Sequence, residues 1–166
     1  FNLGISGNTT FDVLERIESE VTPRMEEGEE TVFVFSIGGN DSTFNKRKGR
    51  NRTAEGDFRK NVEKLIKIAR KYTNRIVFVG LFPVDETKTT PVAWSRILYL
   101  RNESIRKYNE ITKLVCKEKR IDLIDHLGEF SKIDYKKLLS EDGVHPSDKG
   151  HELIFKEVRD FLVKKK

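Results

Sequence analysis

The sequence predicts an α/β fold in which an open parallel sheet carries helices on both faces. Short, nearly continuous apolar runs at 31–37 and 75–82 are rich in β-branched and aromatic residues, which is typical of strands covered on both faces. Amphipathic segments separate these runs, and strands that alternate with helices imply right-handed crossovers and parallel pairing. With 166 residues and neither a linker nor an internal repeat, one domain is expected.

The helices are predicted from apolar residues that recur at three- and four-residue spacing. Four such segments are predicted. The first begins with a cap at Thr10, the second and third span about 57–72 and 99–118, and the fourth begins at Pro146. Two further short strands are expected, one ending at Ile5 and one at 121–124. Each strand except the first therefore follows a predicted helix.

The composition excludes several classes of protein. Hydrophobic and charged residues each make up 36% of the chain, and the clustered Val, Ile, Leu and Phe exclude a disordered chain. No uncharged apolar stretch approaches the roughly 18 residues of a membrane span. The single cysteine, Cys116, lies in a helical pattern and is expected to pack in the core. A reducing, cytoplasmic location is therefore predicted.

The positive charge is local. The net charge is +5, and the segment 46–52 alone contributes five positive charges, so the rest of the chain is neutral overall. A single run that contains Gly and Asn is typical of a flexible, solvated loop, whereas a nucleic-acid binder spreads Lys and Arg along a face. Contact with an anionic substrate or a polyanion is the alternative for this run. No nucleic-acid partner is predicted.

Candidate binding groups follow the predicted strands. In open parallel sheets, ligands bind beyond the carboxyl ends of the strands. After the first strand, Gly7 offers a backbone N–H that no side chain shields. After the second, Gly38 and Gly39 permit a sharp turn, and the amide of Asn40 supplies a two-proton donor. A turn without function is the alternative for each.

Asp142 and His145 form a candidate catalytic pair at the entrance of the last helix. Residues three apart on a turn can face each other, so Asp142 can accept the Nδ1 proton of His145 and leave Nε2 free as a base. Pro146 favours an extended backbone at His145. A capping Asp is the alternative. His126 follows Asp125 directly and His151 lies inside the last predicted helix, so both lack this arrangement and are predicted to be structural.

Metal and cofactor sites are not predicted. No Cys or His cluster has the spacing of metal ligands. The turn at 38–41 lacks the Lys and the Ser or Thr of a phosphate-binding loop.

Taken in order, the blocks at 2–10, 38–41 and 142–146 resemble the SGNH, or GDSL, hydrolase family over nearly the whole chain. The resemblance implies a three-layer, flavodoxin-like α/β/α fold and serine-dependent hydrolysis of carboxylic esters by an esterase, lipase or other acyl hydrolase. It also implies that Gly7 and Asn40 are oxyanion-hole donors, that His145 is the general base and that Asp142 orients it. The expected partner is a small-molecule ester.

The family's nucleophile is a serine in a Gly-Asp-Ser block at the tip of the first strand, and this chain has no such block. The resemblance implies that this strand, its serine and the following helix lie upstream of Phe1. The domain at 1–166 is therefore expected to be N-terminally incomplete and inactive by itself. Internal hydroxyls near the expected site are weaker candidates: Ser6, Thr9, Thr10 and Ser42.

In the family's strand order, 2-1-3-4-5, the missing strand would lie between the strand ending at Ile5 and the strand at 31–37. Without it, these two strands would face each other across roughly 9.6 Å with unpaired backbone groups. A separate segment of the polypeptide, a second copy or another chain is predicted to complete the sheet. The competing functional hypothesis is a noncatalytic ligand-binding domain on the same scaffold.

Three aromatic residues follow strand ends and are candidates for an acyl or sugar pocket, with simple packing as the alternative: Phe44, Phe82 and Trp94.

Overall fold

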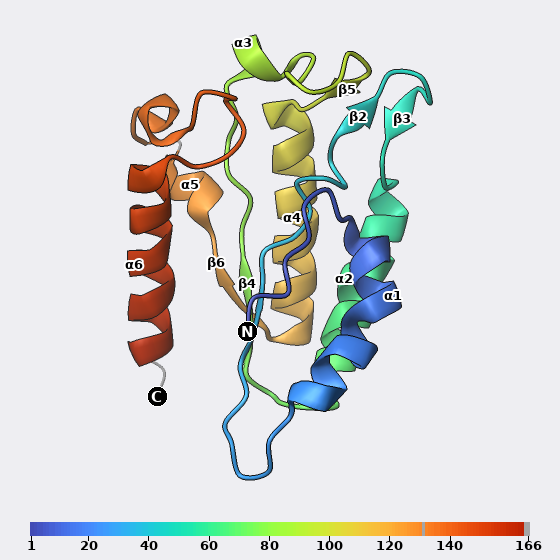
Figure 1. Ribbon diagram of the computed structural model, residues 1–166, viewed down its shortest axis with the longest axis vertical. Coiled ribbons are helices and arrows are strands. Elements are labelled where there is room, and N and C mark those ends of the chain that lie inside the picture. Colours follow the sequence, from blue (N-terminus) through green and yellow to red (C-terminus); the bar gives the residue numbers. More distant parts are fainter. Residues whose placement is uncertain (131, 165–166) are drawn as a thin grey trace.

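Three parallel strands form the central sheet, in the order β1 (Phe33–Phe35), β4 (Ile76–Val79) and β6 (Asp122–Ile124). The computed structural model describes residues 1–130 and 132–164. Helix α2 (Glu55–Ala69) crosses from β1 to β4, and α4 (Asn102–Lys119) crosses from β4 to β6 (Figure 1). From the first helix onward, the predicted alternation of strands and helices is confirmed, and the boundaries of these elements lie within a few residues of their expected positions.

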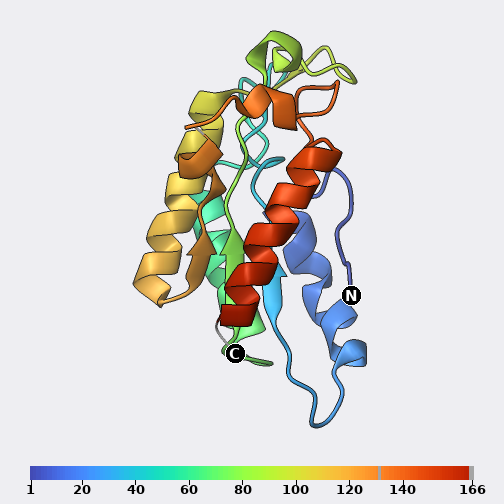
Figure 2. The ribbon, with the colours of Figure 1, turned by 90° about the vertical axis from the view of Figure 1, so that its left-hand side faces the viewer.

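Helices cover both faces of the sheet. Helices α1 (Thr10–Val21), α2 and α4 form one layer, and α6 (Asp148–Lys164) lies on the opposite side (Figures 1 and 2). The main core lies between the sheet and the first layer, where Phe58 and Tyr108 are fully buried with ring centroids 4.9 Å apart. All four residues of β4 are buried, as expected for a central strand.

The N-terminal segment departs from the prediction. Residues 1–5 form no strand, although one was expected to end at Ile5. In the described part of the chain, β1 pairs with β4 alone, and its other edge faces the N-terminal segment (Figure 2). Val34 of β1 is 46% exposed, in contrast to the buried β4. A strand forms only when a neighbouring strand pairs with it. Residues 1–5 have no strand beside them in the described chain, and therefore they form none.

The basic run also departs from the prediction. A small antiparallel sheet joins β2 (Phe44–Asn45), β3 (Arg50–Asn51) and β5 (Leu98–Tyr99), so most of the run is a hairpin turn. Residues 46–50 are exposed, as a solvated loop would be, whereas Arg52 is half-buried. The prediction of a flexible loop fails at Arg52 because cross-strand pairing fixes the backbone of the hairpin.

Short helices complete the fold. They are η1 (Thr22–Arg24), α3 (Glu86–Thr89), α5 (His126–Phe130) and η2 (Tyr135–Leu138). His126 is buried at the start of α5 and stacks on Phe82 at 4.7 Å. Burial lowers the pKa of this imidazole, although the adjacent Glu157 opposes the shift. His151 is exposed on α6.

Cys116 is a core residue. Its side chain is buried in α4, and burial raises the pKa of the thiol to about 12. Because the thiolate is the nucleophilic form, this cysteine is chemically inert at neutral pH. Within residues 1–130 and 132–164, no helix is long and apolar enough to cross a membrane.

Candidate functional site

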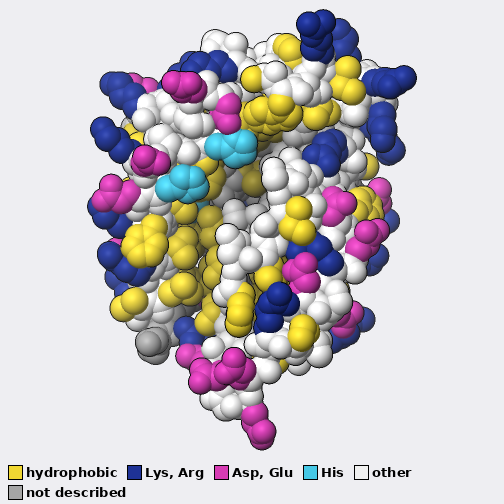
Figure 3. All heavy atoms as spheres, in the orientation of Figure 1, with side chains coloured by type: hydrophobic (Ala, Val, Ile, Leu, Met, Phe, Trp, Pro, Cys, Tyr) yellow, Lys and Arg dark blue, Asp and Glu magenta, His cyan; other side chains and the backbone are white. Residues whose placement is uncertain are grey.

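The predicted site residues meet in one cavity beyond the carboxyl ends of β1 and β4. This site cavity has a volume of about 1010 Å³, and its lining includes Gly7, Asn40, Asp142 and His145. The face shown in Figure 3 is hollowed, with apolar side chains inside the hollow and histidine side chains at its rim. Four positions from three distant parts of the sequence thus line one cavity.

Residues 140–147, here called the His145 loop, hold the imidazole and its carboxylate. Nδ1 of His145 lies 2.6 Å from Oδ2 of Asp142. Oδ1 of Asp142 accepts the backbone N–H groups of Val144 (2.8 Å) and His145 (2.9 Å) and the hydroxyl of Ser140 (2.8 Å). Because Asp142 accepts at Nδ1, the neutral imidazole presents Nε2 as its basic atom.

The carboxylate of Asp142 is held in its ionised form. Burial alone would raise its pKa, but hydrogen bonds from His145, Val144 and Ser140 outweigh burial and hold the pKa well below its usual value. The side chain of His145 is 63% exposed, and its ring centroid lies 5.9 Å from that of Trp94. The pair therefore combines a fixed carboxylate with an accessible base.

The opposite wall is the Asn40 cluster, which we define as Gly7, Asn8, Asn40 and Arg52. Nδ2 of Asn40 donates to the carbonyl of Asn8 (3.0 Å), and Oδ1 of Asn40 accepts from Arg52 (3.3 Å). A second nitrogen of Arg52 donates to the carbonyl of Gly7 (2.9 Å). Sequence reasoning found Gly7 and Asn40 but missed Asn8 and Arg52, because no local pattern marks either of them.

Glycines make the two turns of this cluster possible. Gly7 has φ +80° in the turn closed by the bond from Asn8 N–H to Ile5 carbonyl (3.2 Å). Gly38 has φ +120°, and a Cβ there would lie 3.0 Å from the ring of Phe58. Left-handed backbone and close approach both favour glycine, so the chain can turn sharply at both positions and expose the groups that follow.

Asp41 anchors the cluster from beneath. Its side chain is fully buried and accepts the backbone N–H of Thr10 on both oxygens (3.1 Å each) and the hydroxyl of Thr10 (2.6 Å). Asn61 of α2 donates to the same hydroxyl (3.0 Å). The predicted cap at Thr10 is therefore wrong by one residue: Thr9 is the N-cap of α1, with its N–H bonded to Asp12 at 2.6 Å, and Thr10 is the first helical residue and ties the helix to Asp41.

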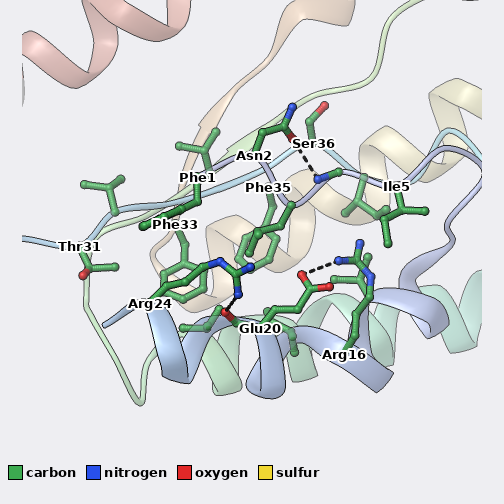
Figure 4. A pocket seen from close by; sticks show the side chains of 18 of the residues that line it. Phe1, Asn2, Ile5, Arg16, Glu20, Arg24, Thr31, Phe33, Phe35 and Ser36 are labelled. Carbon is green, nitrogen blue, oxygen red and sulfur yellow. Dashed lines mark hydrogen bonds and ion pairs between the residues drawn. The ribbon is translucent and has the colours of Figure 1, made fainter. Parts of the chain in front are cut away.

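A second cavity, here called the edge groove, lies between the N-terminal segment and β1 (Figure 4). It has a volume of about 660 Å³ and is lined by residues 1–5, one side of α1 and residues 29–37. Phe35 of β1 faces the paired side chains of Arg16 and Glu20 of α1. The groove shares Ile5, Asn40 and residues 36–37 with the site cavity, so the two cavities adjoin.

Three of the four internal hydroxyls that are candidates for the nucleophile are engaged elsewhere. The Thr9 hydroxyl donates to Asp12 (2.7 Å), and that of Thr10 donates to Asp41. Ser42 is buried and donates to the carbonyl of Gly39 (2.8 Å). Ser6 is exposed and lines the site cavity, which leaves it as the internal candidate to test.

Two of the three candidate aromatics line the site cavity, namely Phe82 and Trp94. Phe44 instead lies under the guanidinium of Arg101, 5.6 Å from its ring centroid. In the part of the chain that the structure describes, no group of three His, Cys, Asp or Glu side chains is arranged to hold a metal ion.

The fold is an α/β fold with a parallel sheet, and the candidate site lies beyond the carboxyl ends of its strands. Residues 1–153 match the GDSL-like Lipase/Acylhydrolase family, and the chain belongs to this family. The resemblance noted from the sequence is thereby confirmed.

Individual relatives agree with this assignment. The protein named uncharacterized lipoprotein YqeF, from Bacillus subtilis (strain 168), is 26% identical over 96% of this chain and 71% of its own length. The lipase/acylhydrolase from Enterococcus faecalis superposes with a TM-score of 0.74 at 21% identity, over 92% of this chain and 69% of that one. A catalytic mutant of Axe2, an acetylxylan esterase from Geobacillus stearothermophilus, gives 0.71 at 22% identity, over 95% and 68%. The solved structures support the fold.

Proposed function

We propose that this protein is part of a serine-dependent hydrolase of carboxylic esters. The observation that carries the proposal is the convergence, in one cavity, of an imidazole–carboxylate pair with the amide of Asn40 and the turn at Gly7. This arrangement suits acyl transfer, which needs a base for the nucleophile and donors for the oxyanion. Asp142 orients His145, and Gly7 and Asn40 are the oxyanion donors.

The reaction has two halves. Nε2 of His145 takes the proton of the serine hydroxyl, the serine oxygen attacks the ester carbonyl, and the oxyanion is held by Gly7 and Asn40. The carbon–oxygen bond to the alcohol then breaks, and His145 returns the proton to the leaving alcohol. Water, activated by the same nitrogen, attacks the acyl-enzyme and releases the carboxylic acid and the free serine.

The serine is proposed to arrive on a strand that fills the edge groove. A strand parallel to β1 in this groove would pair with its free edge, and neighbouring strands lie about 4.8 Å apart. Its carboxyl end would then emerge where the groove opens into the site cavity beside Asn40. A helix after this strand would cover the face of the sheet on which Val34 of β1 is exposed. We assign this strand and helix to a segment that precedes Phe1.

The test is labelling of the polypeptide that includes any residues encoded before Phe1, with a serine-reactive fluorophosphonate and mapping of the label by mass spectrometry. One labelled serine outside residues 1–166 is expected, with labelling lost in His145→Ala. The variant Ser6→Ala should label normally. A label on Ser6 would overturn the external-serine proposal but keep hydrolysis, whereas no label on a folded protein would overturn hydrolysis and favour a noncatalytic ligand-binding domain.

The range of possible acyl groups in the substrate can be narrowed with a panel of p-nitrophenyl esters of increasing chain length. The site cavity is wide, and Phe82 and Trp94 supply apolar surface near His145. Acetylated sugars, fatty acyl esters and lysophospholipids are the candidate substrates. Turnover that peaks at acetyl would favour the first, and turnover that rises with chain length would favour the others.

The cytoplasmic location stays a prediction, based on the single buried thiol of Cys116. The relative from Bacillus subtilis is named a lipoprotein, and this name favours a location outside the cytoplasm. Fractionation of cells that express the full reading frame decides between them.

A further inference from the structure

Arg52 joins the two loops that carry the proposed oxyanion donors. One guanidinium nitrogen donates to Oδ1 of Asn40 (3.3 Å), and another donates to the carbonyl of Gly7 (2.9 Å). Its own backbone is fixed on the Asn40 loop, since its N–H donates to the carbonyl of Thr43 (2.9 Å). Arg52 therefore links Gly7, which lies 45 residues earlier in the chain, to Asn40, which lies 12 residues earlier.

The contacts of Arg52 determine the orientation of the Asn40 side-chain amide, that is, on which sides its oxygen and its nitrogen lie. The two ends of a carboxamide have nearly the same shape, so a half-turn would exchange an acceptor oxygen for a donor nitrogen. A guanidinium only donates, and therefore it pairs with Oδ1 of Asn40 and not with Nδ2. The carbonyl of Asn8 only accepts, and it takes one Nδ2 hydrogen. The second Nδ2 hydrogen is then available to a ligand.

We propose that Arg52 is a positioning residue that locks the Asn40 amide with its nitrogen toward the reacting oxygen and clamps the Gly7 turn beside it. The proposal rests on the proposed function, because it assumes that Asn40 stabilises an oxyanion. A flipped amide would place an oxygen lone pair against the developing negative charge. Preorganised donors avoid this reorganisation during the reaction.

The geometry also distinguishes Arg from Lys at this position. The two acceptors, Oδ1 of Asn40 and the Gly7 carbonyl, are reached by separate nitrogens of one planar group. A lysine ammonium carries the same charge at a single point and lacks the fork. Arg52→Lys therefore keeps the positive charge but loses the double clamp, and Arg52→Gln loses both.

The kinetic experiment compares Arg52→Gln and Arg52→Lys with the control Arg50→Gln in the polypeptide that carries the nucleophile. Arg50 is exposed on the same hairpin. Arg52→Gln is expected to lower kcat about 10- to 100-fold with KM nearly unchanged, and Lys is expected to restore little of this loss. In the Asn40→Ala background, Arg52→Gln should cause a smaller loss than in the parent, because only its contact with the Gly7 turn is left to lose. Additive losses, or an effect confined to KM, would overturn the proposal.

A second measurement does not depend on turnover. The side-chain amide of Asn40 gives a resolvable pair of ¹⁵N–¹H signals in selectively labelled protein. Arg52→Gln should shift this pair or broaden it by amide rotation, whereas Arg50→Gln should leave it in place. An unchanged pair in Arg52→Gln would overturn the positioning role. If the signals shift but no ester is cleaved, the failure belongs to the proposed function and not to the clamp.

Discussion

The two walls of the site cavity are built in different ways. The His145 loop is local: Asp142 meets its partners at 140, 144 and 145, all within three residues of it. The Asn40 cluster is assembled from distant segments, with bonds from Asn40 to Asn8 and from Arg52 to Gly7. The first wall depends on a short sequence, and the second depends on the tertiary fold.

This difference extends to the surroundings of each wall. The backbone of the His145 loop is closed by a bond from Ser140 N–H to the His145 carbonyl (2.8 Å) and is tied to the N-cap of α3 by a bond from Asp85 N–H to the Gly143 carbonyl (2.8 Å). The Asn40 cluster instead adjoins the edge groove, where no strand among the described residues pairs with the outer edge of β1. The His145 loop is therefore complete in this chain, whereas the Asn40 cluster borders the place where we propose that a strand enters.

The largest effect is expected from His145→Ala in the polypeptide that carries the nucleophile. Loss of the base should lower kcat/KM by roughly 1000-fold or more. Because the side chain is exposed, the melting temperature should change little. Ester hydrolysis and a thermal melt measure the two quantities. Activity within tenfold of the parent would remove His145 from the reaction.

A slightly smaller effect is expected from Asn40→Ala. Loss of one oxyanion donor costs about 2.7–4 kcal/mol in the barrier, which corresponds to a roughly 100- to 1000-fold lower kcat. KM should stay close to the parent value because the oxyanion forms only in the transition state. Steady-state kinetics provide the check, with Asn74→Ala, an exposed residue that precedes β4, as the control. A rise in KM at constant kcat would make Asn40 a substrate-binding residue instead.

These differences explain which features the sequence could predict. Continuous apolar runs determined the parallel strands, since burial on both faces leaves a pattern that needs no knowledge of partners. The spacing of Asp142 and His145 predicted their contact for a similar reason: both lie on one turn. Asn40 was located because ligands bind beyond the carboxyl ends of parallel strands and it follows β1, whereas Gly7 lines the same cavity although no strand precedes it.

The features that were missed are those that depend on distant neighbours. Arg52 belongs to a basic run whose other cations are solvated, and only the hairpin turns its side chain toward Asn40 and Gly7. The strand expected to end at Ile5 does not form because the described chain places no strand beside it. Composition cannot reveal either effect, because both depend on tertiary pairing.

The tertiary origin of the Asn40 cluster predicts a stability effect at Asp41. Asp41→Asn replaces one of two buried acceptor oxygens with a donor that faces the N–H of Thr10. The free energy of unfolding should fall by about 2 kcal/mol, as measured by urea denaturation. Asp57→Asn, on the exposed side of α2, is the control and should change it by less than about 0.5 kcal/mol. Equal effects in the two variants would show that Asp41 does not anchor the cluster.

The smallest effect is expected from the His145 loop in acid. Its hydrogen bonds lower the pKa of Asp142 below the unfolded value of about 3.9, so the folded state binds this proton more weakly than the unfolded state. The resulting stabilisation is complete above about pH 4 and is lost as the pH falls through the folded pKa. The free energy of unfolding falls as the pH is lowered from about 5 to 2, and in Asp142→Asn this fall should be smaller by about 1 kcal/mol. Urea titrations across this pH range measure it. Asp134→Asn, an exposed carboxyl beside η2, should leave that limb as steep as in the parent. An Asp142→Asn curve as steep as the parent's would mean that the carboxylate contributes no net stability to the loop, and that its hydrogen bonds serve only to orient the imidazole.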